Sequence, residues 1–187
     1  MKINRYKCLN KQIFKENEFR IIPIRLTDRF KIMKWRNEQI YHLRQKEKLT
    51  KSKQDLYFKD VIKKQFSQAN PDQILFSFFH KNVFIGYGGL VHINWKKQNA
   101  EISFIMDTDL EKIFFKKYWS KFLILIEKVA FYTLDFKKIF VYAYDVRSHL
   151  YPILTENNYK LNERKKNDYT FNNKYLDALI YTKFNCS

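Results

Sequence analysis

The chain has 187 residues, of which 45% are hydrophobic and 18% aromatic, a composition that allows a buried core and excludes an intrinsically disordered protein. Its 36 basic and 19 acidic residues give a net charge of +17. The lysines are scattered over nearly every segment, which favours a drift of composition over a built polyanion-binding surface, so we expect no specific nucleic-acid partner.

Cysteines, histidines and apolar runs exclude further classes. Cys8 and Cys186 lie near opposite ends and fit neither a metal-ligand spacing nor a disulfide framework, and the four histidines are far apart, so we expect no metal. Lys, Asn and Gln interrupt the start of the chain, which is not a signal-peptide pattern. The most apolar helical run, 122–126, is far shorter than the roughly 20 residues of a membrane span. We expect a cytoplasmic protein without a membrane partner.

The first part of the chain predicts one strand and two helices. Residues 1–18 are polar and weakly patterned, and we treat them as an N-terminal extension of a single domain that spans 1–187. Residues 19–26 form an alternating strand, and Thr27-Asp28 offers an N-cap for a helix that ends near Trp35, with a break over 36–38. Apolar residues at helical spacing predict a second helix over 52–66.

The rest of the chain is mostly strands. Two further helices are expected over 113–134 and 148–156. The strands are expected at 74–79, 83–94, 99–107, 138–145, 159–169 and 175–184, with Asn172-Asn173 as the last turn. This order is typical of a mixed α+β sheet protein and not of a repeated βαβ array.

Five segments in this order resemble the GNAT N-acetyltransferase superfamily, over residues 19–184. The central pair is the most informative, because 85–90 holds all three glycines of the chain and 100–107 is an apolar strand with one carboxylate, Glu101. The five segments are DRFKIMKWRN (28–37), IGYGGLVHI (85–93), NAEISFIMD (99–107), KVAFYTLDFKKIFVYAY (128–144) and FNNKYLDALIY (171–181). The likeness is strongest to the bacterial amino-sugar-nucleotide and ribosomal-protein-type branch.

The resemblance implies a mixed, mostly antiparallel central sheet flanked by helices. It also implies acetyl-CoA as co-substrate and a primary amine as acceptor, in the first place an amino-sugar nucleotide of surface glycan biosynthesis. A protein N-terminus or ribosomal protein is the alternative acceptor, and a non-catalytic GNAT-fold binding module is the alternative class. A homodimer is compatible with all three hypotheses.

Two departures bear on the cofactor. Members of the superfamily carry a glycine-rich loop for the CoA pyrophosphate, whereas residues 107–117 contain no glycine. Phe115, Lys116 and Lys117 then remain as candidates at the start of the following helix. The resemblance further assigns acetyl-CoA to the strand around 104–106, that is to Phe104, Ile105 and Met106.

The second departure lies in the short helix. Arg147 and Leu154 stand where the superfamily has Asn and the Tyr that protonates the CoA thiolate. Tyr151 lies three residues earlier on the same helical face and is the substitute candidate, with an aromatic packing role as the alternative. Arg147 and His149 form a polar pair near the expected CoA cleft.

Glu101 is the first candidate for the general base, because burial among Ala, Ile and Phe disfavours the charged form of a carboxylate. The alternative is a structural Glu bonded to a neighbouring strand or to the first helix. His92 is the second candidate, and strand alternation would place it on one face with Leu90 and Asn94.

The acceptor site is expected around the end of the first helix. Arg guanidinium groups favour bidentate phosphate contacts, and aromatic rings stack on bases or sugars. The alternative for the arginines is helix capping or surface ion pairing. The substrate-binding candidates are Trp35, Arg36, Asn37, His42, Arg44 and Asn94.

Overall fold

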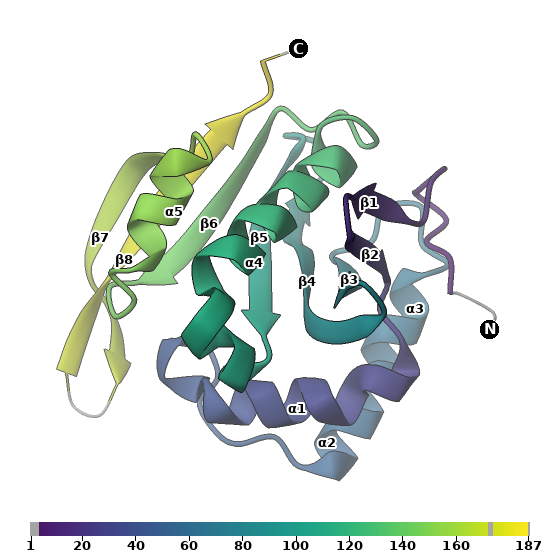
Figure 1. Ribbon diagram of the computed structural model, residues 1–187, viewed down its shortest axis with the longest axis horizontal. Coiled ribbons are helices and arrows are strands. Elements are labelled where there is room, and N and C mark those ends of the chain that lie inside the picture. The colour runs from purple at the N-terminus through teal and green to yellow at the C-terminus, as the bar shows by residue number, and fades with distance from the viewer. Residues whose placement is uncertain (1–3, 172–173, 187) are drawn as a thin grey trace.

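The computed structural model describes residues 4–171 and 174–186, and its frame is one mixed sheet with helices on both faces (Figure 1). The strand order in the described residues is β1-β2-β3-β4-β5-β6-β8-β7. Neighbouring strands are antiparallel except for the parallel pair β5 and β6. The strands are β1 (Phe14–Glu16), β2 (Phe19–Pro23), β3 (Ile74–His80), β4 (Val83–Asn94), β5 (Asn99–Met106), β6 (Lys138–Tyr144), β7 (Lys160–Phe171) and β8 (Lys174–Phe184). The expected fold class is confirmed.

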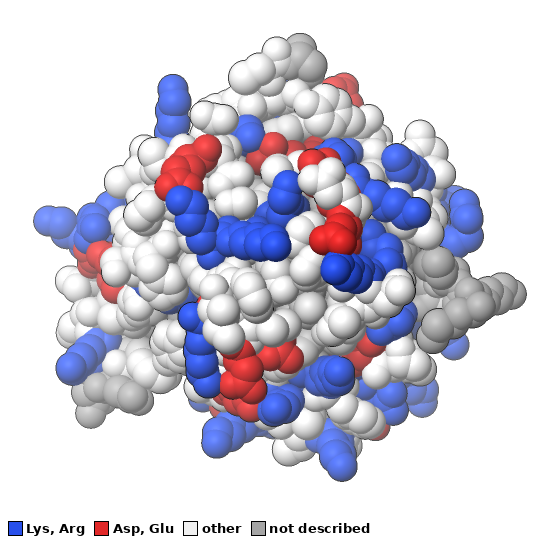
Figure 2. Space-filling model, viewed as in Figure 1, with Lys and Arg blue, Asp and Glu red and all other residues white. Residues whose placement is uncertain are grey.

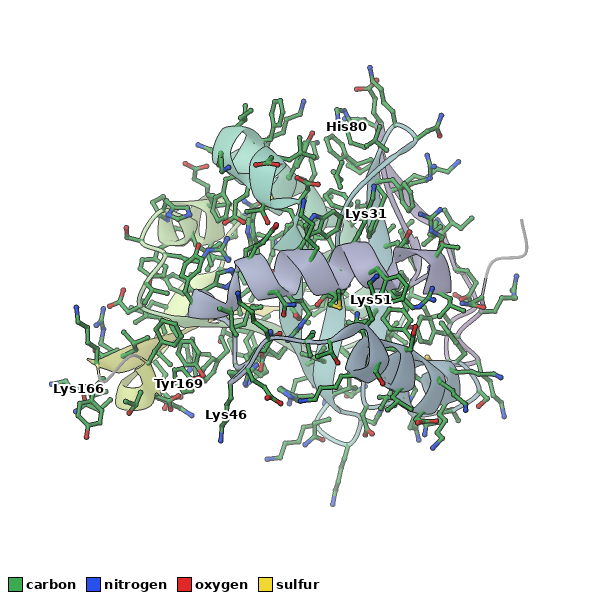
Figure 3. The ribbon with its side chains drawn as sticks, turned by 90° about the horizontal axis from the view of Figure 1, so that it is seen from below. Lys31, Lys46, Lys51, His80, Lys166 and Tyr169 are labelled. Carbon is green, nitrogen blue, oxygen red and sulfur yellow. The ribbon has the colours of Figure 1, made fainter. Side chains whose placement is uncertain are left out.

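Helices of two groups cover the sheet. α4 and α5 pack on one face, and α1 and α2 lie beside each other against the other, as the view from below shows (Figure 3). None of the helices in the described ranges has the length and apolarity that a membrane crossing requires. The helical elements are η1 (Leu26–Asp28), α1 (Arg29–Glu38), η2 (Ile40–His42), α2 (Lys51–Leu56), η3 (Tyr57–Ile62), α3 (Lys63–Gln65), α4 (Thr108–Ala130) and α5 (Leu150–Glu156).

Strand alternation divides the apolar residues between two cores. On the α4 face, Phe78, Phe104 and Phe122 pack together, and the rings of Phe104 and Phe122 stack with centroids 4.1 Å apart. The second core lies under α1 and the helices that follow it. A Cβ atom on Gly88 would lie 2.8 Å from the ring of Phe122 and 2.2 Å from the carbonyl oxygen of Ser103, so this glycine lets α4 approach the sheet closely.

The N-terminal segment is more ordered than its sequence predicts. β1 pairs with β2, and Tyr6, Leu9 and Phe14 are buried in the core on the α4 face, which is the main core of the protein. Tyr6 also holds β3, since its hydroxyl accepts a bond from Leu75 N at 2.9 Å. The apolar residues of this segment are too few and too widely spaced to show a period, and tertiary packing supplies what the local pattern lacks.

Two predicted helices have other boundaries in the structure. α1 continues through Glu38 with no break over 36–38, and the Asp28 carboxylate does not cap it but pairs with Arg25 and accepts a bond from Ser77 Oγ. α4 begins at Thr108, five residues earlier than predicted, and ends at Ala130. The expected turn at Asn172-Asn173 lies outside the described residues.

The early start of α4 removes the expected loop over 107–117. The Asp107 carboxylate accepts hydrogen bonds from the backbone N–H groups of Asp109 and Leu110, at 3.0 and 3.3 Å, and so starts the helix. A kink at Phe114 (φ −117°, ψ 16°) separates these first turns from the rest of α4. An acidic N-cap thus replaces glycine at the beginning of the helix.

Surface charge follows the scattered pattern that the sequence suggests. On the face drawn in Figure 2, Lys and Arg side chains are spread over the surface and interleaved with Asp and Glu. Many are paired, for example Lys116 with Glu156 and Lys183 with Glu127, both at 2.8 Å.

Candidate active site

A cleft opens where β5 and β6 diverge. The two strands pair only at Asn99–Lys138, Ala100–Ile139 and Glu101–Phe140, and beyond these positions they separate (Figure 1). The cleft has a volume of about 570 Å³. Its walls include the end of β4, the middle of β5, part of β6, residues 42–44 and the start of α5. The backbone of β5 past Glu101 therefore borders the cleft on the side where β6 no longer pairs with it.

Glu101 lies at the divergence and is engaged through both of its oxygens. It is 5% exposed, its Oε1 accepts a charge-assisted bond from Arg44 Nη2, and its Oε2 lies 3.0 Å from His92 Nδ1. The Arg44 guanidinium in turn lies 4.8 Å from the ring of Tyr142. Because Ala100 and Ile102 face the other side of β5, Glu101 has a charged and polar environment, in contrast to the apolar one that the sequence suggested.

His92 reaches Glu101 because β4 is irregular there. The register of β4 against β5 shifts between Val91 and Asn94, and His92 has a φ of 48°. Regular alternation would have turned His92 to the face of Leu90, so that expectation was wrong. The side chain of His92 is 64% exposed and lines the cleft. With Nδ1–H donating to the carboxylate, Nε2 is left as a proton acceptor, a tautomer that we infer from the contact.

A second ionic cluster lies at the α5 end of the cleft. Arg147, which is 5% exposed, donates from Nη2 to Glu111 Oε1 at 2.7 Å, and its Nη1 lies 3.2 Å from His42 Nε2. The guanidinium also packs over the ring of Phe115, 4.8 Å from its centroid. Burial and the adjacent Arg147 charge hold the pKa of His42 far below its usual value, so this imidazole is neutral.

Two buried atoms of this cluster lack partners within the described residues. They are Arg147 Nε and Glu111 Oε2, so the ion pair is made through a single hydrogen bond and not through the parallel pair that a guanidinium and a carboxylate can form. Burial raises the pKa of Glu111, against the lowering effect of Arg147. The Arg147–Glu111 ion pair is therefore buried but leaves one donor and one acceptor without a hydrogen bond.

The end of α1 has a structural role. Trp35 is 2% exposed and its ring packs 4.9 Å from that of Phe84, so it is a core residue and cannot stack on a substrate, contrary to our expectation. Arg36 donates to Gln45 Oε1 and to the Tyr87 hydroxyl, both at 2.9 Å. The Asn37 side chain bonds to both backbone polar groups of Leu49.

Arg36 also lies between the cleft and a second chamber. This chamber has a volume of about 250 Å³, and four residues line both spaces: Arg36, Gln73, Val91 and Ser103. The remaining lining is apolar or aromatic except for Gln54, and Arg36 is the one charged residue among the described residues that line the chamber. Arg36 has no carboxylate within ion-pair distance in the described parts of the chain.

Most residues expected to bind the cofactor lie outside the cleft. Phe104 lines it, whereas Ile105 belongs to the second core and the Met106 carbonyl accepts a bond from Gln39 Nε2 at 2.8 Å. Lys116 pairs with Glu156, and the Lys117 ammonium lies 5.8 Å from the ring of Phe19.

Two other candidates are also held elsewhere. Asn94 accepts a bond from Lys97 N in a turn, and the His149 ring packs 4.4 Å from that of Phe115. Neither residue lines the cleft.

Tyr142 and Tyr144 are two cleft tyrosines that the sequence did not single out. Tyr151 donates to Asp145 Oδ1 at 2.7 Å and stacks on Tyr181, and it does not line the cleft. Tyr144, at the end of β6, does line it, and burial raises its pKa to about 12. The sequence feature that could have indicated Tyr144 is its position as the last of the alternating aromatic residues of β6. Leu154, at the usual position of the acid, is buried in the main core.

The fold matches that of known acetyltransferases. No protein-family model matches the sequence, and a search of the curated proteins finds no match either. Among solved structures, spermidine N-acetyltransferase from Vibrio cholerae in complex with CoA and spermine superposes with a TM-score of 0.76 at 14% identity, over 90% of this chain and 96% of that chain. Mutant forms of the spermidine/spermine N-acetyltransferase from the same organism give 0.75 at 14% identity, over 90% and 95%.

These matches establish the fold class. The chain has the fold of the GNAT N-acetyltransferases, as its five motifs predicted. In this fold the cleft between β5 and β6 and the Glu101–His92 pair that lines it form the candidate active site.

The buried neutral state of His42 predicts a pH effect on stability. Below the unfolded pKa of about 6.5 the unfolded chain takes up a proton that folded His42 does not, so the free energy of unfolding falls as the pH falls. His42→Gln keeps a group that accepts from Arg147 and removes this titration. Between pH 7.5 and 5, urea unfolding of the wild type should lose roughly 1–2 kcal/mol more than the variant. Equal losses would contradict the assignment.

Proposed function

We propose that the protein is an acetyl-CoA-dependent N-acetyltransferase. The observation that carries the proposal is the divergence of β5 and β6 directly beside a buried carboxylate and an exposed imidazole. A strand edge without a partner offers backbone N–H and C=O groups to an extended amide-bearing chain. The pantetheine arm of CoA is such a chain, and Arg147 at the α5 end of the cleft offers a cation for its phosphates.

Acetyl transfer requires the loss of a proton from the amine. His92 Nε2 is the proton acceptor that we assign, because it is exposed in the cleft while Glu101 is not. Glu101 holds Nδ1–H and stabilises the imidazolium that forms, and Arg44 binds the other oxygen of the Glu101 carboxylate. Glu101 is therefore a positioning residue in this assignment and not the base.

The leaving thiolate requires a proton in return. Acetyl-CoA supplies the acetyl group as a thioester, and the amine nitrogen forms its new bond to the carbonyl carbon as the C–S bond breaks. Tyr144 is the proton donor that we assign, since it lines the cleft and its raised pKa keeps its hydroxyl protonated. Tyr151 would need to leave Asp145 to take this role.

The acceptor that the site supports is a primary amine that also carries negative charge, and an amino-sugar nucleotide is our specific proposal. Three guanidinium groups line the cleft, those of Arg36, Arg44 and Arg147, against two carboxylates, Asp72 and Glu101. Arg36 has neutral hydrogen-bond partners and no counter-ion among the described residues. A phosphate near Arg36 would be favoured by charge and by bidentate geometry.

A polyamine is the second candidate, because the two similar structures described above are named as spermidine acetyltransferases. The charge of the second chamber disfavours a polyamine as the acceptor. A polyamine that extends into the chamber would place an ammonium group next to Arg36, with no carboxylate among the described lining residues. A protein N-terminus remains the third acceptor that an assay must include.

Calorimetric titration with CoA tests the cleft directly. We expect binding in the micromolar range, worth about −8 kcal/mol, because the β5 edge and Arg147 are both in place. Desulfo-CoA should bind with similar affinity, since no described residue of the cleft is a thiol ligand. No heat at millimolar CoA would favour the alternative of a non-catalytic binding module.

Substitution of the proton acceptor separates chemistry from binding. His92→Gln should lower kcat by roughly 10²–10⁴-fold with little change in the Kd of acetyl-CoA, because a general base acts on the amine and not on the cofactor. His80→Gln is the matched control, since His80 lies at the end of β3, away from the cleft, and bonds to Tyr118 (Figure 3). A His92 variant with unchanged kcat would remove His92 from the mechanism.

An acceptor panel decides between the substrate classes. With a UDP-linked amino sugar, spermidine and a short peptide as acceptors, we expect kcat/KM to be at least about 10-fold higher for the sugar nucleotide, from its phosphate contacts. Arg36→Lys, which keeps the charge but not the fork, should reduce that preference. Preferred acetylation of spermidine would instead establish the polyamine candidate, and acetylated peptide the protein candidate.

A further inference from the structure

The start of α4 is closed to a phosphate group. In proteins that this chain resembles, a glycine-rich loop and the helix N-terminus bind the CoA pyrophosphate. Here the Asp107 carboxylate already accepts from the N–H groups of Asp109 and Leu110, and Asp109 and Glu111 add two more carboxylates to the first turn. An anion at this helix end would meet three negative charges, and Lys112 is already paired with Asp109 at 2.8 Å.

Arg147 is the positive group that faces the same end of the cleft. It precedes α5, lines the cleft and is buried, and its Nε has no hydrogen-bond partner within the described residues. Its contacts with His42 and Phe115 fix the guanidinium plane without neutralising it, because His42 is neutral. Glu111 is the one carboxylate in the described chain that pairs with it.

We propose that Arg147 is the diphosphate-binding residue of the cleft, and that Glu111 is an internal carboxylate which holds its guanidinium until the CoA diphosphate takes its place. The inference rests on the proposed function. It assigns to one buried arginine the task that a glycine-rich loop performs elsewhere in the fold, and it gives Glu111 the role of an exchangeable counter-ion.

The geometry of the pair favours such an exchange. The Glu111 carboxylate bonds through Oε1 alone, and its Oε2 and Arg147 Nε are both left unsatisfied in a buried place. A diphosphate presents several oxygens and can accept from Nε and Nη2 together, which satisfies the donor that the carboxylate leaves free. Replacement of the carboxylate by a diphosphate therefore exchanges one anion for another and also gives Arg147 Nε a hydrogen-bond acceptor.

Glu111 has a route out of the pair. It lies in the first turns of α4, on the N-terminal side of the kink at Phe114, whereas the Phe115 ring that supports Arg147 lies beyond the kink. The first turns can thus shift without moving the support of the guanidinium. Once released, the carboxylate stays near the helix N-terminus, where the helix dipole stabilises negative charge.

Calorimetry with CoA and with pantetheine, which lacks the phosphates, tests the exchange. Glu111→Gln removes the competing charge and should tighten CoA binding by about 5- to 10-fold while leaving pantetheine unchanged. Arg147→Gln should weaken CoA binding by at least about 10-fold and leave pantetheine unchanged. Asp109→Asn is the matched control, since it removes an equal charge from the same turn, but from an exposed side chain, and should change CoA affinity less than 2-fold.

Thermal melting tests the exchange without any measurement of acetyl transfer. Glu111→Gln leaves a buried guanidinium without a counter-ion, so its Tm should fall, and saturating CoA should raise the Tm of this variant more than that of the wild type. Unchanged or weaker CoA binding in Glu111→Gln, or an equal gain in Asp109→Asn, would overturn the exchange while leaving the proposed function intact. A wild-type protein that binds neither CoA nor pantetheine would overturn the proposed function and the exchange together.

Discussion

The parallel pairing of β5 and β6, which stops after three residue pairs, is the constraint on which the rest of the site depends. Each strand is fixed on its other side, β5 by antiparallel β4 and β6 by antiparallel β8, so the opening needs no hinge to persist. A continuous sheet would bury the β5 edge in backbone hydrogen bonds. Because the strands separate at Glu101, the one carboxylate of β5 lies where the cleft begins. His92, Arg44 and Tyr144 line the same cleft.

Electrostatics within the cleft follows from how each arginine is neutralised. Arg44 is paired with Glu101, and Arg147 with Glu111, while Arg36 relies on an amide and a hydroxyl. Arg36 is half-buried, and a cation with only neutral partners gains stabilisation from a ligand that brings negative charge. The cleft is thus suited to anionic groups at two separate places. This separation is what the proposed acceptor, an amino-sugar nucleotide, would require, since both it and the cofactor carry phosphate.

The sequence predicted the strands from β2 onward and the fold class, because alternation and motif order are properties of local pattern. It could not predict that His92 turns toward Glu101, since a bulge reverses the face that alternation assigns. It placed Trp35 on a substrate surface, whereas the second core encloses this ring, because apolar helical spacing does not say which core a residue joins. The pairing of Arg147 with Glu111 joins residues 36 positions apart and has no sequence pattern at all.

The missing glycines gain a different meaning once α4 is seen to start at Thr108. Loss of a glycine-rich loop alone suggests a protein that no longer binds a nucleotide. The residues that replace the loop, however, form a capped helical turn whose third carboxylate, that of Glu111, pairs with the buried Arg147. The desolvation free energy of a buried ion pair disfavours its formation. A segment that had lost its function would therefore not be expected to keep one, whereas a binding site for an anion would. The replacement of glycine by an acidic turn therefore argues for a relocated anion site more than for a lost one.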